Sequence, residues 1–114
     1  MKVDKRRKHK RYQIRDGGFV MLRNPFKILG QIGDINAKGL SFSYSFSEIV
    51  APESFELDMV FIDSGFYLFR VPFNTVYDQQ ISREIRRCGV LFRKLTENQL
   101  SVIGSFIKIY SKSR

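Results

Sequence analysis

Residue types that carry chemistry or covalent cross-links are scarce in this chain of 114 residues. It contains one cysteine, Cys88, one histidine, His9, and no tryptophan. A single cysteine excludes a disulfide within the chain and is typical of proteins from a reducing compartment. One cysteine and one histidine far apart in the sequence do not supply the ligands of a zinc site. We therefore expect no disulfide, no metal and no cofactor, and we expect Cys88 to be an ordinary, partly buried strand residue.

Long apolar segments are also missing. The longest runs, such as residues 19–22 and 102–109, are short or interrupted, and they fall well below the roughly 20 residues of a transmembrane helix. No apolar stretch follows the N-terminal charges, so the sequence lacks the pattern of a secretory signal peptide. We expect a cytoplasmic protein without a membrane span.

No arrangement of catalytic residues is apparent in the sequence. His9 lies between Lys8 and Lys10 in a polar segment, where positive neighbours disfavour its protonation and no apolar wall excludes water. The sequence shows no paired acids, no catalytic triad and no glycine loop of the P-loop type. We therefore expect a protein without enzymatic activity.

Positive charge is concentrated at the N-terminus. Residues 1–15 carry eight Lys and Arg side chains against one carboxylate, Asp4, which is a net charge of +7 out of +9 for the whole chain. The remaining residues are therefore close to neutral. A segment this rich in charge and poor in apolar residues cannot bury enough surface to offset the entropy of ordering. The pattern predicts a flexible basic arm over residues 1–15 that binds an anionic partner.

Residues 16–114 are expected to form a single domain, because the chain has 11 Phe and 5 Tyr to fill a core. The clearest strand begins at Leu40, where apolar residues alternate with serines at the period of a half-buried strand. Similar patterns, separated by turn residues such as those at 63–65, predict further strands. Pro72 is expected at a sheet edge or a bulge, because proline donates no backbone hydrogen bond. The predicted strands cover residues 19–23, 26–34, 40–45, 55–59, 66–78 and 86–95.

The C-terminal segment is expected to form a helix over about residues 96–111. Thr96 and Gln99 match a capping box, in which each side chain bonds the backbone N–H of the other residue. Apolar residues then recur at helical spacing and form one stripe that can pack on a sheet. Together the elements favour an all-β fold with one helix, as a small six-stranded antiparallel β-barrel with a C-terminal amphipathic helix. The stripe consists of Leu100, Ile103, Phe106, Ile107 and Tyr110.

A first motif lies in the basic arm. Arg7 and Arg11 are four residues apart, and Arg6 stands beside the first. The arginine side chain offers a planar fork of donors that fits phosphate oxygens or the O6/N7 edge of guanine, and its face stacks on bases. The arm alone also fits a solvated tail or a nonspecific contact with nucleic acid.

A second motif, the segment DINAKG from Asp34 to Gly39, lies between two predicted strands. A carboxylate at a turn can accept hydrogen bonds from N1 and N2 of guanine, Asn36 adds an amide, and Gly39 permits a positive φ and the close approach of a ligand. The same segment also fits a plain turn, in which Asp and Asn bond backbone N–H groups. Combined, the arginines and the carboxylate would recognise guanine from two edges.

The order and spacing of these two motifs resemble the PilZ domain family. Its signatures are an arginine pair spaced RxxxR and a (D/N)xSxxG turn, and this chain has Arg7 to Arg11 followed by Asp34 to Gly39. The likeness continues through CGVLF at residues 88–92 and the closing helix, so that it covers nearly the whole chain. The resemblance implies a PilZ-like barrel that binds the bacterial second messenger cyclic di-GMP. In that family the arginine segment folds over a ligand seated against the turn.

The resemblance also implies roles for individual residues. The arginine pair would grip guanine edges and phosphates, and Asp34 and Gly39 match the acid and the glycine of the turn. Asn36 stands where the family has serine; because it is longer and carries both a donor and an acceptor, it could replace a hydroxyl contact or crowd it. Arg6 could serve a second ligand molecule, so the expected ligand is one cyclic di-GMP or an intercalated dimer.

The expected function is that of a non-enzymatic cyclic di-GMP receptor in bacterial signalling. The ligand would be clamped between the arm and the turn, and the output would pass to a protein partner that the sequence does not identify. One alternative is a PilZ-like adaptor that does not bind the ligand, with Asn36 as the sign of the loss. A less favoured alternative is nonspecific RNA or DNA binding by the arm, which charge alone supports.

Overall fold

The computed structural model describes residues 11–22, 28–45, 56–62 and 66–111. These residues form seven strands and one helix. The strands predicted from alternating apolar residues are present, with ends shifted by a few residues; the last one ends at Phe92 rather than at Leu95. In chain order the elements are β1 (Tyr12–Gln13), β2 (Gly18–Leu22), β3 (Ile28–Ile35), β4 (Gly39–Ser45), β5 (Glu56–Phe61), β6 (Phe66–Gln80), β7 (Ile85–Phe92) and α1 (Glu97–Tyr110).

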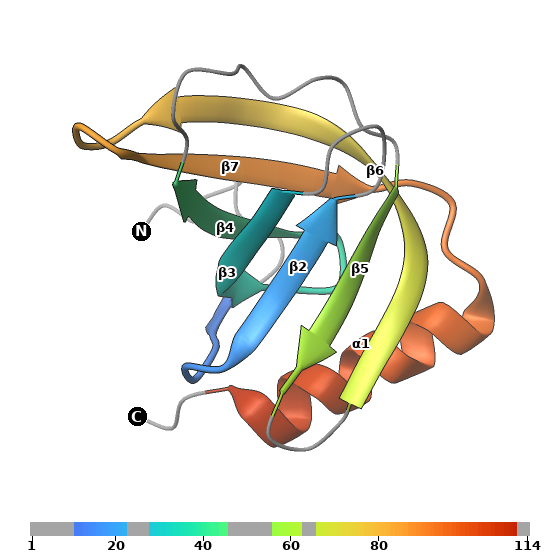
Figure 1. The fold of residues 1–114 in the computed structure, drawn as a ribbon. Coiled ribbons are helices and arrows are strands. Elements are labelled where there is room, and N and C mark those ends of the chain that lie inside the picture. The colour runs from blue at the N-terminus through green and yellow to red at the C-terminus, as the bar shows by residue number, and fades with distance from the viewer. Residues whose placement is uncertain (1–10, 23–27, 46–55, 63–65, 112–114) are drawn as a thin grey trace, which may run out of the picture.

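Strands β2 to β7 close into an antiparallel barrel (Figure 1). They follow the order β3-β2-β5-β6-β7-β4, and β4 pairs with β3 to complete the ring. Closure gives these strands backbone partners on both sides, which removes the exposed edges that would otherwise pair with other chains. The prediction of a six-stranded antiparallel barrel with a C-terminal helix is confirmed.

The short strand β1 joins the end of the basic segment to the barrel. It pairs with the end of β3, with Gln13 opposite Asp34. The next residue, Ile14, is only 4% exposed, and its N–H donates to the carbonyl of Gly33 at 3.0 Å. The C-terminal boundary predicted for the flexible arm, residue 15, is therefore too late, because residues 12–14 already pair with the barrel. An apolar side chain with a place in the core fixes the backbone here despite the charges around it.

Apolar side chains at alternate strand positions fill the barrel. The ring of Phe42 occupies the space that a side chain at Gly30 would need, so glycine lets β3 lie close to this ring. Because directly paired strands present the same face at opposed positions, the inward residues of all six strands meet in one core. Its most fully buried members are Val20, Ile32, Ile35, Leu40, Phe42, Leu57, Met59, Phe61, Val71, Phe73, Ile103 and Phe106.

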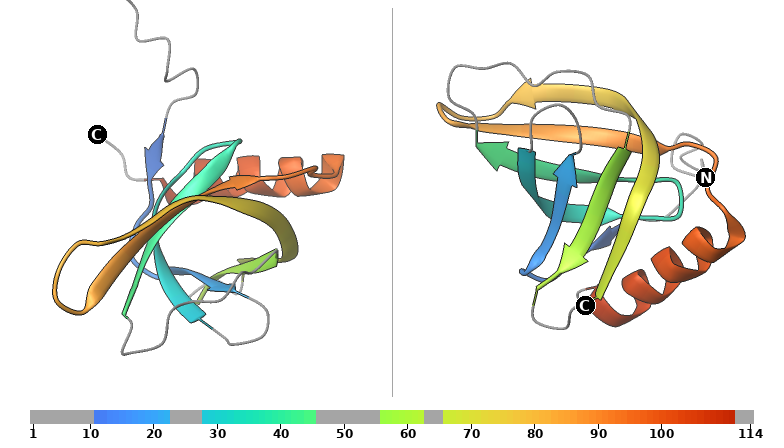
Figure 2. Two further views of the ribbon diagram at one scale, coloured as in Figure 1. Left: turned by 90° about the horizontal axis from the view of Figure 1, so that it is seen from above. Right: turned by 45° about the vertical axis from the view of Figure 1, so that its right-hand side comes forward.

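Helix α1 covers one end of the barrel (Figures 1 and 2). The Phe61 ring meets the Tyr110 ring edge-on, with centroids 3.6 Å apart, and it also contacts Phe106. Ile103 is buried beside them. The predicted apolar stripe is correct for these helical residues and wrong for Leu100, which is 45% exposed. Leu100 lies in the first turn of the helix, where the chain has only begun to approach the barrel.

The helix begins as its sequence predicts. The Thr96 hydroxyl accepts a hydrogen bond from the Gln99 N–H at 3.0 Å, and the Gln99 side chain accepts one from the Thr96 N–H at 3.0 Å. These reciprocal bonds satisfy two N–H groups that a helix start leaves without a partner. The predicted capping box is confirmed, and α1 runs over residues 97–110.

Strands β6 and β7 form a long hairpin that projects beyond the barrel (Figure 2). Near its start β6 is bulged: Arg70 has φ 59°, and its N–H donates to the Asp58 carboxylate at 2.9 Å. Pro72 follows two residues later, opposite Glu56, where pairing with β5 ends. Pro72 was expected at a sheet edge or a bulge. It lies just after the bulge, at the last pair between β5 and β6, where the strand changes partners and the missing N–H costs little.

Candidate functional site

The turn between β3 and β4 is built by the side chain of Asn36. Its Oδ1 accepts hydrogen bonds from the N–H groups of Lys38 at 2.7 Å and Gly39 at 3.1 Å. Its own N–H donates to the Gly39 carbonyl at 2.9 Å, and the residue is 9% exposed. This is the Asx-type turn that the plain-turn interpretation of the segment predicts for Asn36. A contact between Asn36 and a ligand stays a prediction, and any contact through Oδ1 would compete with these bonds.

Gly39 is required by packing between strands. A Cβ atom at this position would collide with the carbonyl oxygen of Val90 on β7. Gly39 is also paired with Leu91, so the two backbones are held close together. Gly39 does not use the positive φ that a glycine permits, because among the described glycines only Gly17 has one. The close approach that the glycine permits is that of a neighbouring strand, and contact with a ligand stays a prediction.

Asp34 and Arg11 form an ion pair at the outer surface of the barrel. A terminal nitrogen of Arg11 donates to Asp34 Oδ1 at 2.7 Å, and the Ser41 hydroxyl donates to the same oxygen at 3.0 Å. The contact joins the two sequence motifs, because Arg11 and Asp34 are 23 residues apart. Two of the predicted site residues are therefore brought together directly.

The strand register explains why these two side chains meet. Asp34 lies opposite Gln13 in β1, and Arg11 precedes Gln13 by two residues and so faces the same side. A bulge between Ile32 and Asp34 shifts the register of β3 against β4. After this shift Asp34 points away from the core, while Ile35 is fully buried. The buried side chain of Ile14, beside β1, and the bulge in β3 thus position the charged pair.

The pair is partly exposed to solvent. The Arg11 side chain is 41% exposed and that of Asp34 is 27% exposed. Ion pairs of this kind contribute only about 0.2–1 kcal/mol, because water competes for both groups. Either partner can therefore exchange this contact for a bond to a ligand at small cost.

The remaining predicted site residues are Arg6 and Arg7, and one further residue was missed. Arg6 and Arg7 lie outside the described residues, and their roles stay predictions. Ser41, which sequence reasoning placed only on the polar face of a strand, bonds Asp34 and is 2% exposed. Its position two residues after Gly39 on a strand paired with β3 was the available signal, but the bond depends on a register that the sequence does not specify.

A second cluster of polar side chains, the hairpin cluster of Tyr44, Asp78 and Arg86, lies on the hairpin side of the barrel. The Tyr44 hydroxyl lies 3.0 and 2.8 Å from the two oxygens of the Asp78 carboxylate, to which it donates. Arg86 donates from Nε to Asp78 Oδ1 at 3.0 Å and from a terminal nitrogen to the Asp78 carbonyl at 2.8 Å. Burial of Tyr44, together with its bond to Asp78, raises the pKa of the hydroxyl, and the bond to Asp78 raises the pKa of Arg86. The cluster ties β4, β6 and β7 together.

Cys88 lies beside this cluster and is buried. Burial raises the pKa of its thiol to about 12, and the nearby Asp78 carboxylate acts in the same direction. A thiol with so high a pKa is protonated at neutral pH and is a poor nucleophile. This agrees with the expectation that Cys88 is an ordinary strand residue.

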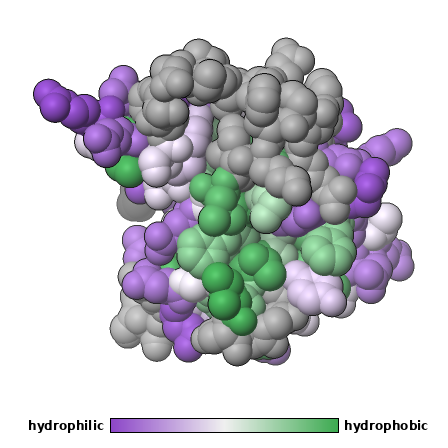
Figure 3. Space-filling model, in the orientation of Figure 1, coloured by the Kyte–Doolittle hydropathy of each residue, from purple (hydrophilic) through white to green (hydrophobic). Residues whose placement is uncertain are grey.

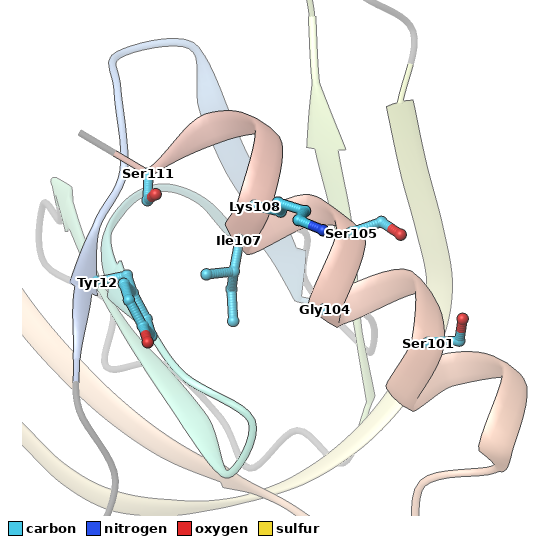
Figure 4. Close-up of a pocket in the computed structure, with 7 residues that line it drawn as sticks. All are labelled: Tyr12, Ser101, Gly104, Ser105, Ile107, Lys108 and Ser111. Atoms are coloured by element: carbon cyan, nitrogen blue, oxygen red, sulfur yellow. The ribbon is translucent and has the colours of Figure 1, made fainter. Parts of the chain in front are cut away.

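A separate hollow of about 590 Å³ lies between β1 and α1 (Figure 4). Tyr12 and Ile107 face each other across it, whereas Ser101 and Ser105 lie along the helix. Neither Arg11 nor Asp34 is among its lining residues, so it is not the site of the ion pair. The lining residues are Tyr12, Ser101, Gly104, Ser105, Ile107, Lys108 and Ser111.

Comparison of the chain with models of known protein families and with curated protein sequences finds no match. Within the described ranges, no helix is long and apolar enough to cross a membrane. The same residues contain no group of three or more His, Cys, Asp or Glu that could hold a metal ion. The fold and the Arg11–Asp34 contact therefore carry the functional argument.

Proposed function

We propose that the chain is a non-enzymatic, ligand-binding signalling domain whose site is the outer surface around Asp34. More particularly, we propose a PilZ-like receptor for cyclic di-GMP, acting in the bacterial cytoplasm. The observation that carries the proposal is the 2.7 Å contact between Arg11 and Asp34. It joins the last arginine of the RxxxR motif to the first residue of the DINAKG turn, the two motifs on which the resemblance rests.

The chemistry of the pair suits guanine. A carboxylate accepts from the N1 and N2 donors of the base, and a guanidinium donates to O6 and N7 or to phosphate oxygens. Without ligand Arg11 and Asp34 satisfy each other, and on binding each would turn to the complementary edge of the dinucleotide. Because the exposed ion pair is weak, breaking it costs little of the free energy of ligand binding. Arg7, and Arg6 with a second ligand molecule, would add contacts to phosphates and bases.

Binding would convert a basic segment into part of a surface. An arm that folds over the ligand would offer new side chains beside β1 and the β3–β4 turn, which adjoin each other through the β1–β3 pairing. A change of this kind can be recognised by a protein partner, to which the signal passes. The lysines of the arm would speed the encounter with an anionic ligand without defining its identity.

Isothermal titration calorimetry with cyclic di-GMP tests the proposal. We expect binding at micromolar ligand and a loss of at least about a hundredfold in Arg11→Ala, since each charge-assisted hydrogen bond contributes about 1.5–3 kcal/mol and arginine can form two. Arg83→Ala is the matched control, because Arg83 is exposed at the tip of the β6–β7 hairpin. Absence of heat at tens of micromolar ligand, or equal affinity in Arg11→Ala, would contradict the receptor function.

A second candidate function is that of an adaptor that contacts proteins without the ligand. It is favoured by an apolar outer face on the side of the barrel seen in Figure 3. Leu29 is 58% exposed and lies opposite Met21, and Tyr67, 54% exposed, stacks on Phe69 at 4.7 Å. Exposed apolar faces of this kind commonly mark protein contacts. The receptor function is preferred because an adaptor gives no reason for the Arg11–Asp34 contact.

Nonspecific nucleic-acid binding rests on the charge of the arm alone. Its affinity would fall steeply with salt and would not depend on sequence, because release of counterions dominates. Guanine recognition by Asp34 instead predicts a shallower dependence on salt and strong preference over cyclic di-AMP. Titrations with both dinucleotides at two salt concentrations separate the two functions.

A further inference from the structure

The residue pairs around Asp34 form a continuous row across four strands of the barrel. Asp34 on β3 lies opposite Ser41 on β4, Ser41 lies opposite Gly89 on β7, and Gly89 lies opposite Tyr77 on β6. Directly opposed residues share one face of a sheet. The Ser41–Asp34 hydrogen bond confirms this for the first pair. The row therefore extends the candidate site from Arg11 and Asp34 across the outer face to Tyr77.

A bulge in β6 places Tyr77 on this outer face. Phe73 is buried in the core and Asn74 is exposed, so strict alternation would turn residue 77 inward again. The register of β6 against β7 shifts between Thr75 and Tyr77, which adds Val76 as an extra residue. After the shift Tyr77 pairs with Gly89 rather than pointing into the core. Bulges of this kind re-aim side chains at surface sites.

Gly89 leaves room for the tyrosine ring to lie over β7. A Cβ atom at this position would collide with the Tyr77 ring, whose Cζ would lie 2.7 Å away. The ring is half-buried and covers the glycine, so it lies one strand closer to Asp34 than its own backbone does. Since neighbouring strands are about 4.8 Å apart, the ring over β7 is about 10 Å from Asp34 on β3.

We infer that Tyr77 is an aromatic platform on which a purine base of the bound dinucleotide stacks. This inference rests on the proposed function and extends the site beyond the residues of the two motifs. A cyclic dinucleotide carries two bases joined by a ring of sugars and phosphates, so one base can meet Asp34 while the other lies about a nucleotide's length away, over Tyr77. Arg87, exposed two residues before Gly89, supplies a positive charge at the edge of the same face.

Titration calorimetry of full-length variants with cyclic di-GMP tests the platform. Tyr77→Ala should weaken binding by about tenfold to a hundredfold, the loss typical of removing one base–aromatic stack. Tyr77→Phe keeps the ring and should stay within about threefold of the wild type, which separates stacking from a hydrogen bond to the hydroxyl. Tyr67→Ala is the matched control, because Tyr67 is an exposed aromatic residue on the same strand outside the row.

Fluorescence gives a second measurement that does not depend on removing a side chain. The chain contains no tryptophan, so Tyr77→Trp introduces a single reporter that keeps an aromatic surface. A base stacked on the indole should quench its emission as cyclic di-GMP is added, at the same midpoint as the heat of binding.

The outcomes separate this inference from the function on which it rests. If the wild type binds cyclic di-GMP but Tyr77→Ala binds equally well, or the indole emission of the Tyr77→Trp variant stays unchanged at saturation, the platform is wrong and the receptor function stands. If the wild type does not bind cyclic di-GMP, both the Tyr77 platform and the receptor function are wrong. A loss in Tyr77→Ala that also appears in Tyr67→Ala would contradict a local platform.

Discussion

The barrel contains two Arg–Asp pairs of similar length and exposure that are held very differently. Arg11 and Asp34 are 2.7 Å apart, and Arg86 and Asp78 are 3.0 Å apart. The Asp78 carboxylate also accepts from the buried Tyr44 hydroxyl at both of its oxygens. Within the described part of the chain, by contrast, the hydrogen bonds to the Asp34 carboxylate both end on Oδ1.

This difference indicates two roles for the same pair of residue types. Asp78 links side chains from β4, β6 and β7, three strands that also pair with one another through their backbones. Arg11 instead approaches Asp34 from beside a two-residue strand at the end of the basic segment. A contact embedded in several strands stabilises the fold, whereas a contact made from beside one short strand can be exchanged for a ligand.

Removing each carboxylate in turn should have opposite effects: the loss of Asp34 should reduce ligand affinity, and the loss of Asp78 should reduce stability. We expect Asp34→Asn to weaken cyclic di-GMP binding by at least about a hundredfold, because the charge that pairs with guanine donors is lost. It should lower the free energy of unfolding by less than about 1 kcal/mol, because the amide oxygen can still accept the hydrogen bond from Ser41. Asp78→Ala should leave the affinity unchanged and lower the free energy of unfolding by about 1–3 kcal/mol, because the buried Tyr44 hydroxyl loses its acceptor. Urea unfolding and calorimetry measure the two effects.

The two variants control for each other, since both remove the charge of a partly exposed aspartate in the same barrel. A parallel loss of stability in both would mean that the Arg11–Asp34 pair is also structural. A loss of affinity in Asp78→Ala, measured below its unfolding midpoint, would mean that the hairpin cluster takes part in binding.

The elements that follow from local pattern were predictable from the sequence. The alternation after Leu40 and the reciprocal cap of Thr96 and Gln99 depend on neighbouring residues, and both are present. The exposed position of Leu100 was not predicted, because spacing alone does not say where a helix first meets the barrel. The anchoring of Ile14 was missed because the charges around it dominate the composition of that segment.

Within the site, the motifs could be found in the sequence but their supporting contacts could not. The bond from Ser41 to Asp34 depends on a bulge in β3, and the outward position of Tyr77 depends on a bulge in β6. A one-residue shift of register turns every side chain to the other face. A sequence pattern with period two does not reveal where such shifts occur.

Alkaline pH should destabilise the hairpin cluster and the neighbouring Cys88, and it should leave the Arg11–Asp34 pair unchanged. Burial raises the pKa of Cys88 to about 12, and it raises the pKa of Tyr44 as well. The unfolded chain releases the Cys88 proton above about pH 8.5 and the Tyr44 proton above about pH 10, while the folded chain retains both, so the free energy of unfolding falls as pH rises. Each such group contributes at most about 1.4 kcal/mol per pH unit within its range, and the contribution is complete below about pH 8.5.

Urea unfolding between about pH 8 and pH 11 measures this slope. The double variant Tyr44→Phe with Cys88→Ala should start from a lower stability and lose less of it as pH rises, because neither side chain can then release a proton. Tyr67→Phe is the control, since Tyr67 is 54% exposed and lies away from the cluster. An equal slope in the double variant and the wild type would show that other groups govern alkaline unfolding.

The smallest effect is expected from Asn36→Ser, which tests the turn between the two strands that carry the site. Oδ1 of Asn36 bonds the N–H groups of Lys38 and Gly39, and a serine hydroxyl forms the same kind of turn more weakly. We therefore expect the free energy of unfolding to fall by less than about 1 kcal/mol and the affinity for cyclic di-GMP to change by less than about tenfold. A wild type that does not bind together with an Asn36→Ser variant that does would instead favour the adaptor, because the longer side chain at the turn would then be what excludes the ligand.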